Sequence, residues 1–365
     1  MSDCECSRVA QFSSTWRNAS LLKATRSGEG RARPTPGTPG AGAPEGEELS
    51  GLGRSAFVIN PEPPFRLDLS VWALRRRPGN AIDRWDGTSY RRALALSDEP
   101  VGLSVTRADG LEAPHLAVVL IGRGMGGQVE EEVRASIERM LGVRTDLSAF
   151  YRMAADDTLT GPLVARFRGL KPPRFPTVFE SLLNAVACQQ LSLEAGLSLL
   201  NRLAEAYGLA VSVDGSSLHA FPRPQDLANL ERQALRELGF SLRKAATIIE
   251  LSRASVAGRL DLESLEHLAD DEVVSRLTRL SGIGRWSAEY VLLRGLGRLH
   301  VFPGDDVGAR NNLARWLGLE SPLDYGAVRR AVSRWQPYAG MVYFHLLLDR
   351  LAAADELDRG STTPG

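Results

Sequence analysis

The stretch that decides the fold is Leu280–Ala288, with the sequence LSGIGRWSA. The residues before it, about 272–280, repeat apolar side chains along one face of a helix, and residues 286–296 do so along a second helix. Gly282 and Gly284 allow positive φ and a close backbone approach. The N–H groups that open the second helix can bind an anion. The stretch therefore predicts a helical hairpin that binds phosphate.

A second motif, Pro303–Asp306 (PGDD), follows downstream. The Pro-Gly pair predicts a turn that brings Asp305 and Asp306 to the first turn of a further helix. An anion site beside a pair of carboxylates indicates binding of a phosphate backbone combined with chemistry.

Together these motifs resemble the helix-hairpin-helix DNA glycosylases, most of all the 3-methyladenine DNA glycosylase II type. The similarity covers about residues 64–350. Its other shared segments are Phe179–Leu183, Gln189–Ser192, Leu238–Ser241, Lys244–Ala245, Tyr290 and Leu293–Gly295.

Composition bounds the class of protein. A chain of 365 residues with 43% hydrophobic content can bury a large core and is expected to hold two domains. Three cysteines exclude a disulfide framework and a four-cysteine iron–sulfur cluster. Because no apolar run reaches about 18 residues and the N-terminus lacks an apolar signal core, we expect no membrane association and a cytoplasmic, nucleoid-associated protein.

The formal net charge of +0 is unusual for a DNA-binding protein. Its distribution is more informative than its sum. Residues 276–315 contain seven arginines against three acids. This local excess is compatible with DNA binding, although an exposed helix also carries such charge for solubility.

Four segments are expected along the chain. Residues 1–60 are rich in Gly, Pro, Ser and charge and predict a disordered tail, and residues 356–365 predict a frayed one. Residues 61–152 predict an α+β domain, and residues 153–355 predict an all-α domain. The α+β domain is expected to have strands at 65–69, 90–96, 101–105 and 115–121 and a helix at 130–141. The resemblance implies that its sheet is antiparallel and TATA-binding-protein-like, and that the helical part is the glycosylase domain.

Helical periodicity dominates the second half, where strand-like alternation has little support. The helices are expected near 178–206, 225–238, 242–257, 271–280, 286–296, 305–316, 325–335 and 338–353.

Asp306 is the candidate catalytic carboxylate. Hydrolysis of an N-glycosidic bond develops positive charge on the sugar, which a fixed carboxylate can stabilise while it orients or deprotonates water. Aspartate at this position is most often a helix cap. The resemblance aligns Asp306 with the catalytic position of the family and leaves Asp305 as the expected cap.

Trp286 stands where the resemblance implies a lysine in bifunctional glycosylase/lyases. Tryptophan cannot form a Schiff base, which favours a monofunctional hydrolase that uses water. Trp286 could be a core residue; the resemblance implies instead that it lines the base pocket with Tyr290, where aromatic faces would bind cationic alkylated purines. The family member with the broadest alkylpurine range has a tyrosine where this chain has Val307 and a tryptophan near Leu347, so this chain has fewer aromatic side chains for the pocket.

Further site residues follow from the resemblance. Gln189, Gln190 and Leu191 would contact the DNA minor groove, and Gln190 or Leu191 would fill the gap left by a flipped nucleotide; the glutamines could also be a solvated helix face. The remaining predicted DNA contacts are Lys244, Gly282, Gly284, Arg285 and Ser287. The carbonyls of Thr278, Leu280 and Ile283 could coordinate a K⁺ or Na⁺ ion that rigidifies the hairpin.

The expected function is excision of alkylated purines of the 3-methyladenine and 7-methylguanine type in base excision repair. The enzyme is expected to be a monomer that acts on double-stranded DNA with a damaged base and needs no organic cofactor. Two alternatives stay open, namely a non-catalytic hairpin module that binds DNA and a glycosylase for another base lesion.

Overall fold

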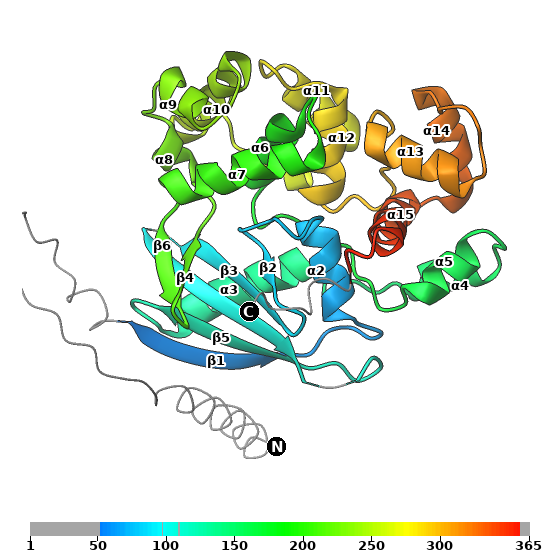
Figure 1. The fold of residues 1–365 in the computed structure, drawn as a ribbon, viewed down its shortest axis with the longest axis horizontal. Coiled ribbons are helices and arrows are strands. Elements are labelled where there is room, and N and C mark those ends of the chain that lie inside the picture. The colour runs from blue at the N-terminus through cyan, green and yellow to red at the C-terminus, as the bar shows by residue number, and fades with distance from the viewer. Residues whose placement is uncertain (1–51, 97, 109, 358–365) are drawn as a thin grey trace, which may run out of the picture.

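Five antiparallel strands form the sheet of the N-terminal part (Figure 1). The structure is a computed structural model that describes residues 52–357 except Ser97 and Asp109. The strands are β1 (Gly53–Ile59), β2 (Arg84–Trp85), β3 (Ser89–Leu96), β4 (Glu99–Arg107) and β5 (Leu116–Gly122), in the order β1-β5-β4-β3-β2. The expected antiparallel sheet is confirmed.

The two faces of this sheet are covered by different parts of the chain. Side chains alternate between the faces along β4, so Val101, Leu103 and Val105 join a core with α2 (Leu67–Arg75) and α3 (Gly127–Leu141). The opposite face meets a hairpin from the helical half, β6 (Ala210–Val213) and β7 (Ser216–His219), whose first strand lies beside β4 in Figure 1. A Cβ added at Gly102 would lie 2.3 Å from Val213, because the hairpin packs closely there.

Two further cores hold the helical half together. The first lies among α6 (Val178–Cys188), α7 (Leu193–Tyr207), α8 (Pro224–Leu227), α9 (Arg232–Glu237), α10 (Leu242–Val256), α11 (Asp270–Thr278) and α12 (Arg285–Arg294). The second joins α2 to α4 (Ser148–Ala155), α5 (Thr160–Arg166), α13 (Val307–Trp316), α14 (Tyr325–Val332) and α15 (Ala339–Ala353). Short 3₁₀ helices cover Glu263–His267 and Ser333–Trp335.

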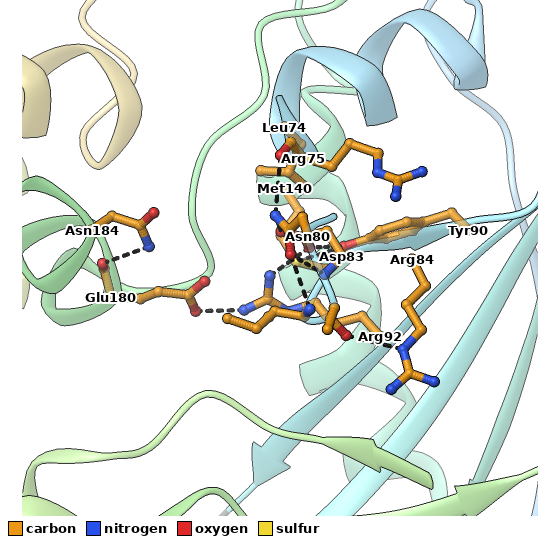
Figure 2. Close-up of polar contacts among 12 residues, drawn as sticks. Leu74, Arg75, Asn80, Asp83, Arg84, Tyr90, Arg92, Met140, Glu180 and Asn184 are labelled. Carbon is orange, nitrogen blue, oxygen red and sulfur yellow. Dashed lines mark hydrogen bonds and ion pairs between the residues drawn. The ribbon is translucent and has the colours of Figure 1, made fainter. Parts of the chain in front are cut away.

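A buried ion-pair cluster connects the sheet to the helical half. Arg92 on β3 donates to Asp83 at 2.6 Å and also binds Glu180 on α6 (Figure 2). Tyr90 donates its hydroxyl to the same Asp83 at 2.7 Å. The ionic side chains are at most 4% exposed, so the cluster fixes the sheet against α6 only if all of its members are present.

Five predictions of secondary structure need correction. The tail predicted at 1–60 includes β1, while residues 1–51 and 358–365 lie outside the described residues. The strand predicted at 65–69 is wrong, because α2 begins at Leu67 and the alternation of apolar and polar residues over 65–69 runs into its first turn. The helices predicted at 178–206 and at 225–238 are each two helices, α6 and α7 in the first range and α8 and α9 in the second. The β6–β7 hairpin was not predicted. The helix predicted at 130–141 is confirmed within α3, with Val133, Ile137, Met140 and Leu141 buried.

Candidate active site

The hairpin between α11 and α12 depends on one close contact. Gly282 has φ +82°, and a Cβ there would lie 2.3 Å from the hydroxyl of Thr247 on α10. Only glycine fits this position without a shift of α10. Gly284 has φ −105°, and a Cβ added there would have no heavy atom within 4 Å. The prediction of positive φ is therefore confirmed for Gly282 and wrong for Gly284, which is the N-cap of α12.

Gln189 supports the hairpin from within. It is the C-cap residue of α6, and its Nε2 donates to the Gly282 carbonyl at 2.9 Å and to the Ser287 hydroxyl at 3.0 Å. Ser287 is 1% exposed. The side chains of these two predicted DNA contacts thus face each other, and the alternative of a solvated helix face does not hold for Gln189.

The turn between α6 and α7 carries the two residues predicted to fill the gap that a flipped nucleotide leaves in the DNA duplex. Gln190 has φ +56°, a left-handed conformation that raises this residue out of α6. Gln190 and Leu191 are exposed, Leu191 to 45%, and both line the edge of the site cavity. Ser192 ends the turn, since its hydroxyl accepts from the Ala195 N–H at 3.2 Å and caps α7.

Lys244 is held by backbone carbonyls. Its Nζ donates to the carbonyls of Ala187 and Gln189, each at 2.8 Å, at the C-terminal end of α6. Partial burial lowers the pKa of this amine. A cation at a helix C-terminus is favourable, so Lys244 has a structural role here in addition to any contact with phosphate.

Asp306 is the N-cap of α13. Its Oδ1 accepts from the Ala309 N–H at 2.8 Å, and its Oδ2 accepts from Trp286 Nε1 at 3.2 Å. Within the described ranges no lysine, arginine or histidine forms an ion pair with Asp306. The expectation that Asp305 caps this helix is wrong: Asp305 Oδ2 instead binds Arg285 at 2.6 Å.

The turn at Asp305 is attached to two other helices. Arg285, whose side chain is 51% exposed, lies 3.8 Å from the ring centre of Tyr325 on α14. Tyr325 donates its hydroxyl to Glu289 Oε1 at 2.6 Å, and Glu289 Oε2 accepts from the Gly304 N–H at 3.0 Å. Burial raises the pKa of Glu289. This latch (Arg285, Glu289, Gly304, Asp305 and Tyr325) holds the turn that positions Asp306.

The aromatic pair predicted for the base pocket lies beside Asp306. The rings of Trp286 and Tyr290 are 5.7 Å apart at 37°. Both line, with Asp306 and Tyr343, a cavity of about 1140 Å³ between the hairpin, the α6–α7 turn, α13 and α15. Tyr290 is 3% exposed, and burial raises the pKa of its hydroxyl, so this residue serves both core and cavity wall. Val307 and Leu347 also line the cavity.

Comparison with known proteins decides the family. Residues 183–337 match the model of the HhH-GPD superfamily base excision DNA repair proteins. A DNA-3-methyladenine glycosylase of Bacillus subtilis is 33% identical over 216 residues, which cover 59% of this chain and 71% of the relative. The chain belongs to the helix-hairpin-helix DNA glycosylase superfamily.

Other superfamily members match this glycosylase over most of their length. DNA-3-methyladenine glycosylase 2 of Escherichia coli is 27% identical over 290 residues, 80% of this chain and 96% of the relative. The structure of 3-methyladenine DNA-glycosylase from Archaeoglobus fulgidus is similar with a TM-score of 0.70 and 28% identity, over 81% of this chain and 98% of the other.

Arg76 is a cavity residue that we did not predict. It lies at the C-cap of α2 with φ +65°, is 4% exposed and lines the cavity. Its Nη1 donates to the Tyr290 hydroxyl at 2.8 Å and its Nη2 to Asn184 Oδ1 at 2.7 Å. The sequence signal was a run of three arginines, Arg75–Arg77, directly after an apolar stretch.

The predicted hairpin ion involves carbonyls alone. The Leu280 carbonyl accepts from the Ile283 N–H at 3.1 Å and keeps a second lone pair. Among the residues that the structure describes, no group of three or more His, Cys, Asp or Glu side chains could hold a metal. In the same part of the chain, no helix is both long and apolar enough to span a bilayer.

Proposed function

We propose that this glycosylase is a monofunctional hydrolase that excises alkylated purines of the 3-methyladenine and 7-methylguanine type from double-stranded DNA. The observation that carries the proposal is the placement of Asp306: its carboxylate borders the cavity, lies within hydrogen-bonding distance of Trp286, and has no cationic partner among the described residues. The names of the Bacillus and Escherichia relatives support the same substrate class.

The reaction that this geometry supports begins with a base rotated out of the duplex. Trp286 and Tyr290 offer aromatic faces on which the flipped base would stack. As the C1′–N bond breaks, its electron pair leaves with the base and positive charge develops on the sugar. Asp306 would stabilise this charge and accept the proton of the water whose oxygen adds to C1′. The products are a free base and an abasic site.

Water is favoured over an amine as the nucleophile. Position 286 is tryptophan, and the one lysine that lines the cavity in the described part of the chain is Lys244. Its Nζ already donates to two carbonyls of the α6 end, so it is poorly placed to attack a sugar carbon. A Schiff base, which lyase chemistry requires, has no available amine here.

The hairpin is proposed as the main contact with the DNA backbone. The first turn of α12 leaves N–H groups without intrahelical partners, and Gly284 and Arg285 are exposed there. Gln190 and Leu191 would enter the duplex where the base has left. A K⁺ or Na⁺ ion on the carbonyls of Thr278, Leu280 and Ile283 would rigidify the hairpin. We propose that the protein works as a monomer on nucleoid DNA.

The test is release of bases from DNA methylated to contain 3-methyladenine and 7-methylguanine. Wild type should release both, and Asp306→Asn should slow release at least about 100-fold, the typical scale of general-base catalysis. Asparagine is also a good N-cap, so Asp306→Asn should melt at nearly the same temperature and bind DNA with unchanged affinity.

Asp305→Asn is the matched control, because it removes the neighbouring carboxylate and breaks only the ion pair with Arg285. We expect it to reduce release only a few-fold. A larger loss for Asp305→Asn than for Asp306→Asn would show that the carboxylate has been assigned wrongly. Wild type without any release, despite DNA binding, would support the non-catalytic alternative.

A further inference from the structure

Tyr343 on α15 lies in the wall of the cavity together with Asp306, the N-cap of α13. The two helices pack against each other and are neighbours in Figure 1. Tyr343 is 9% exposed, and its ring belongs to the core that α13 and α15 share. The residue therefore has a buried ring and borders the space next to the candidate carboxylate.

Two aromatic neighbours fix the direction of this ring. Phe302 meets it edge-on, with ring centres 5.8 Å apart at 85°, and Phe344 does so at 5.4 Å and 80°. Phe302 directly precedes the Pro303–Asp306 turn. Tyr343 is thus packed against the segment that brings Asp306 to the cavity.

The hydroxyl of Tyr343 differs from the other polar groups on the aromatic side chains of the cavity. Trp286 Nε1 donates to Asp306, and the Tyr290 hydroxyl accepts from Arg76. Within residues 52–357 as described, the Tyr343 hydroxyl forms no hydrogen bond, and it is not among the polar atoms sealed from solvent. Because enclosed hydroxyls normally have a partner, this one is expected to bind something inside the cavity.

Charges near this hydroxyl keep it protonated. Burial raises the pKa of Tyr343, and the Asp306 carboxylate raises it further, whereas Arg294 and Arg76 act in the opposite direction. The oxygens of Asp306 accept from the Ala309 N–H and from Trp286 Nε1. In this described part of the chain Asp306 and Tyr343 thus influence each other without a direct hydrogen bond, an arrangement that a bridging water suits.

We propose that Tyr343 is a positioning residue for the attacking water, whose two protons are bound by the Asp306 carboxylate and by the Tyr343 hydroxyl oxygen. This inference rests on the proposed glycosylase function. With both protons bound, a lone pair of the water oxygen is left to point at C1′ of the sugar. The oxygen forms the bond to C1′, the electron pair of the C1′–N bond leaves with the base, and one water proton passes to Asp306. Tyr343 keeps its own proton throughout.

Water is favoured over the flipped base as the partner of this hydroxyl. The faces on which the base would stack, Trp286 and Tyr290, belong to α12, whereas Asp306 and Tyr343 belong to α13 and α15. An ionised carboxylate only accepts hydrogen bonds, so a molecule that bridges the two groups must donate to Asp306. Water can donate to Asp306 and to the Tyr343 oxygen at once, and the reaction consumes a water at this place.

Methanol distinguishes a nucleophile held by two groups from one held by Asp306 alone. It can replace water in the attack on C1′, but its single O–H can donate to only one of the two oxygens. The experiment uses a duplex with one 7-methylguanine, in single-turnover reactions at saturating enzyme with a fixed fraction of methanol. Addition of water gives an abasic site that alkali cleaves, whereas addition of methanol gives a methyl glycoside that alkali leaves intact. The readout is the ratio of these two products, corrected for a reaction without enzyme.

Tyr343→Phe keeps the ring and its contacts with Phe302 and Phe344 but removes the hydroxyl. It should raise the methanol-to-water product ratio at least about threefold and slow hydrolysis by about 3- to 10-fold, the effect of one lost hydrogen bond. Tyr338→Phe is the matched control, because Tyr338 is the N-cap residue of the same helix and does not line the cavity. It should change neither quantity. A purely structural defect would slow both additions together and leave the ratio unchanged.

A double variant tests whether the hydroxyl acts through the water that Asp306 activates. If it does, Tyr343→Phe should slow release much less in an Asp306→Asn background than in wild type, because two residues that share one interaction are not additive. Equal slowing in both backgrounds would mean that the hydroxyl contacts the base or serves the fold, and it would overturn the inference. Melting temperature and affinity for undamaged duplex control for folding.

The outcomes keep the two proposals apart. If wild type releases 7-methylguanine and Tyr343→Phe leaves the product ratio unchanged, this inference is wrong while the proposed function stands. If the ratio rises for Tyr343→Phe and not for Tyr338→Phe, both stand. If wild type releases no 7-methylguanine, the proposed function fails and this inference fails with it.

Discussion

Arg92 and Arg76 are both enclosed by the protein, yet they differ in what balances their charge. Arg92 binds two carboxylates, Asp83 and Glu180, in a cluster that connects the sheet to α6. Arg76, on the cavity wall, binds only neutral acceptors. Removing charges from water costs several kcal/mol per ion, and this cost is offset only when the ions are well paired and hydrogen-bonded. The contrast is that Arg92 is paired with two carboxylates inside the fold, whereas Arg76 donates to uncharged groups at the cavity wall.

The same contrast holds for the carboxylates. Asp305 forms an ion pair with Arg285 and belongs to the latch, whereas Asp306 accepts hydrogen bonds from an amide and an indole. These two adjacent residues thus divide the tasks of fixing the turn and facing the cavity.

The largest effect should come from breaking the balanced cluster. Arg92→Met leaves Asp83 and Glu180 buried and uncompensated, which should lower the free energy of unfolding by about 3–5 kcal/mol. Urea unfolding would measure it. The control is Arg91→Met, the next residue on β3, whose ion pair with Asp86 is partly exposed and should contribute about 1 kcal/mol or less. Equal losses for the two variants would contradict the structural role assigned to the cluster.

The hairpin could be predicted from the sequence because its signal is local, whereas the choice between Asp305 and Asp306 as the helix cap could not. Gly282 must adopt positive φ within a short turn, but two adjacent aspartates at a helix start have the same local pattern, and only the structure shows that Asp306 is the cap. Helix α3 could be predicted from the sequence as well, since one of its faces is buried and apolar and the other is solvated and polar. By contrast the start of α2 alternates apolar and polar residues, a pattern that also fits a strand, and nearly all of its side chains are buried.

Arg76 and Gln189 could not be assigned from sequence because their partners are distant. Arg76 meets Asn184 and Tyr290 across 108 and 214 residues of chain, and Gln189 meets Ser287 across 98. A run of arginines or a pair of glutamines has the same local pattern whether it faces solvent or a cavity. Only the packing of α2, α6 and α12 against one another decides whether these side chains face solvent or the cavity.

His345 is a buried titratable group that does not line the cavity, and it extends the comparison of buried charges to a side chain that can lose its charge. Burial lowers the pKa of His345 on α15 to about 4, against the hydrogen bond to the Met341 carbonyl. Unlike Arg76, histidine can lose its charge, and here it stays neutral. Because the unfolded chain binds this proton near pH 6.5, the native state binds fewer protons between pH 6.5 and 4. Stability is therefore fully present above pH 6.5 and falls as the pH drops toward 4.

At pH 5 the loss should be about 2 kcal/mol relative to pH 7. Urea unfolding of wild type and His345→Leu at both pH values isolates it, since the other titrating groups are common to the two proteins. The variant should lose about 2 kcal/mol less than wild type on acidification. Parallel losses would mean that His345 does not titrate in this window.

The smallest effect should come from loosening the latch. Tyr325→Phe keeps the ring that faces Arg285 but removes the hydroxyl bound to Glu289 at 2.6 Å. A hydrogen bond of this kind contributes roughly 1–2 kcal/mol, and only part of that should reach the Asp306 turn, so single-turnover base release should slow by about 3- to 10-fold without loss of DNA affinity.

Tyr151→Phe is the matched control. Tyr151 lies on α4, which does not line the cavity, and the variant removes a hydroxyl that accepts a hydrogen bond from the Gly169 N–H. It should change melting temperature but not the release rate. If the two variants slow release equally, the effect is one of general stability. If only Tyr325→Phe slows release, the position of Asp306 depends on the turn that Glu289 holds. The paired charges of the latch then position Asp306, the carboxylate that has no ion-pair partner among the described residues and is proposed to act on the sugar.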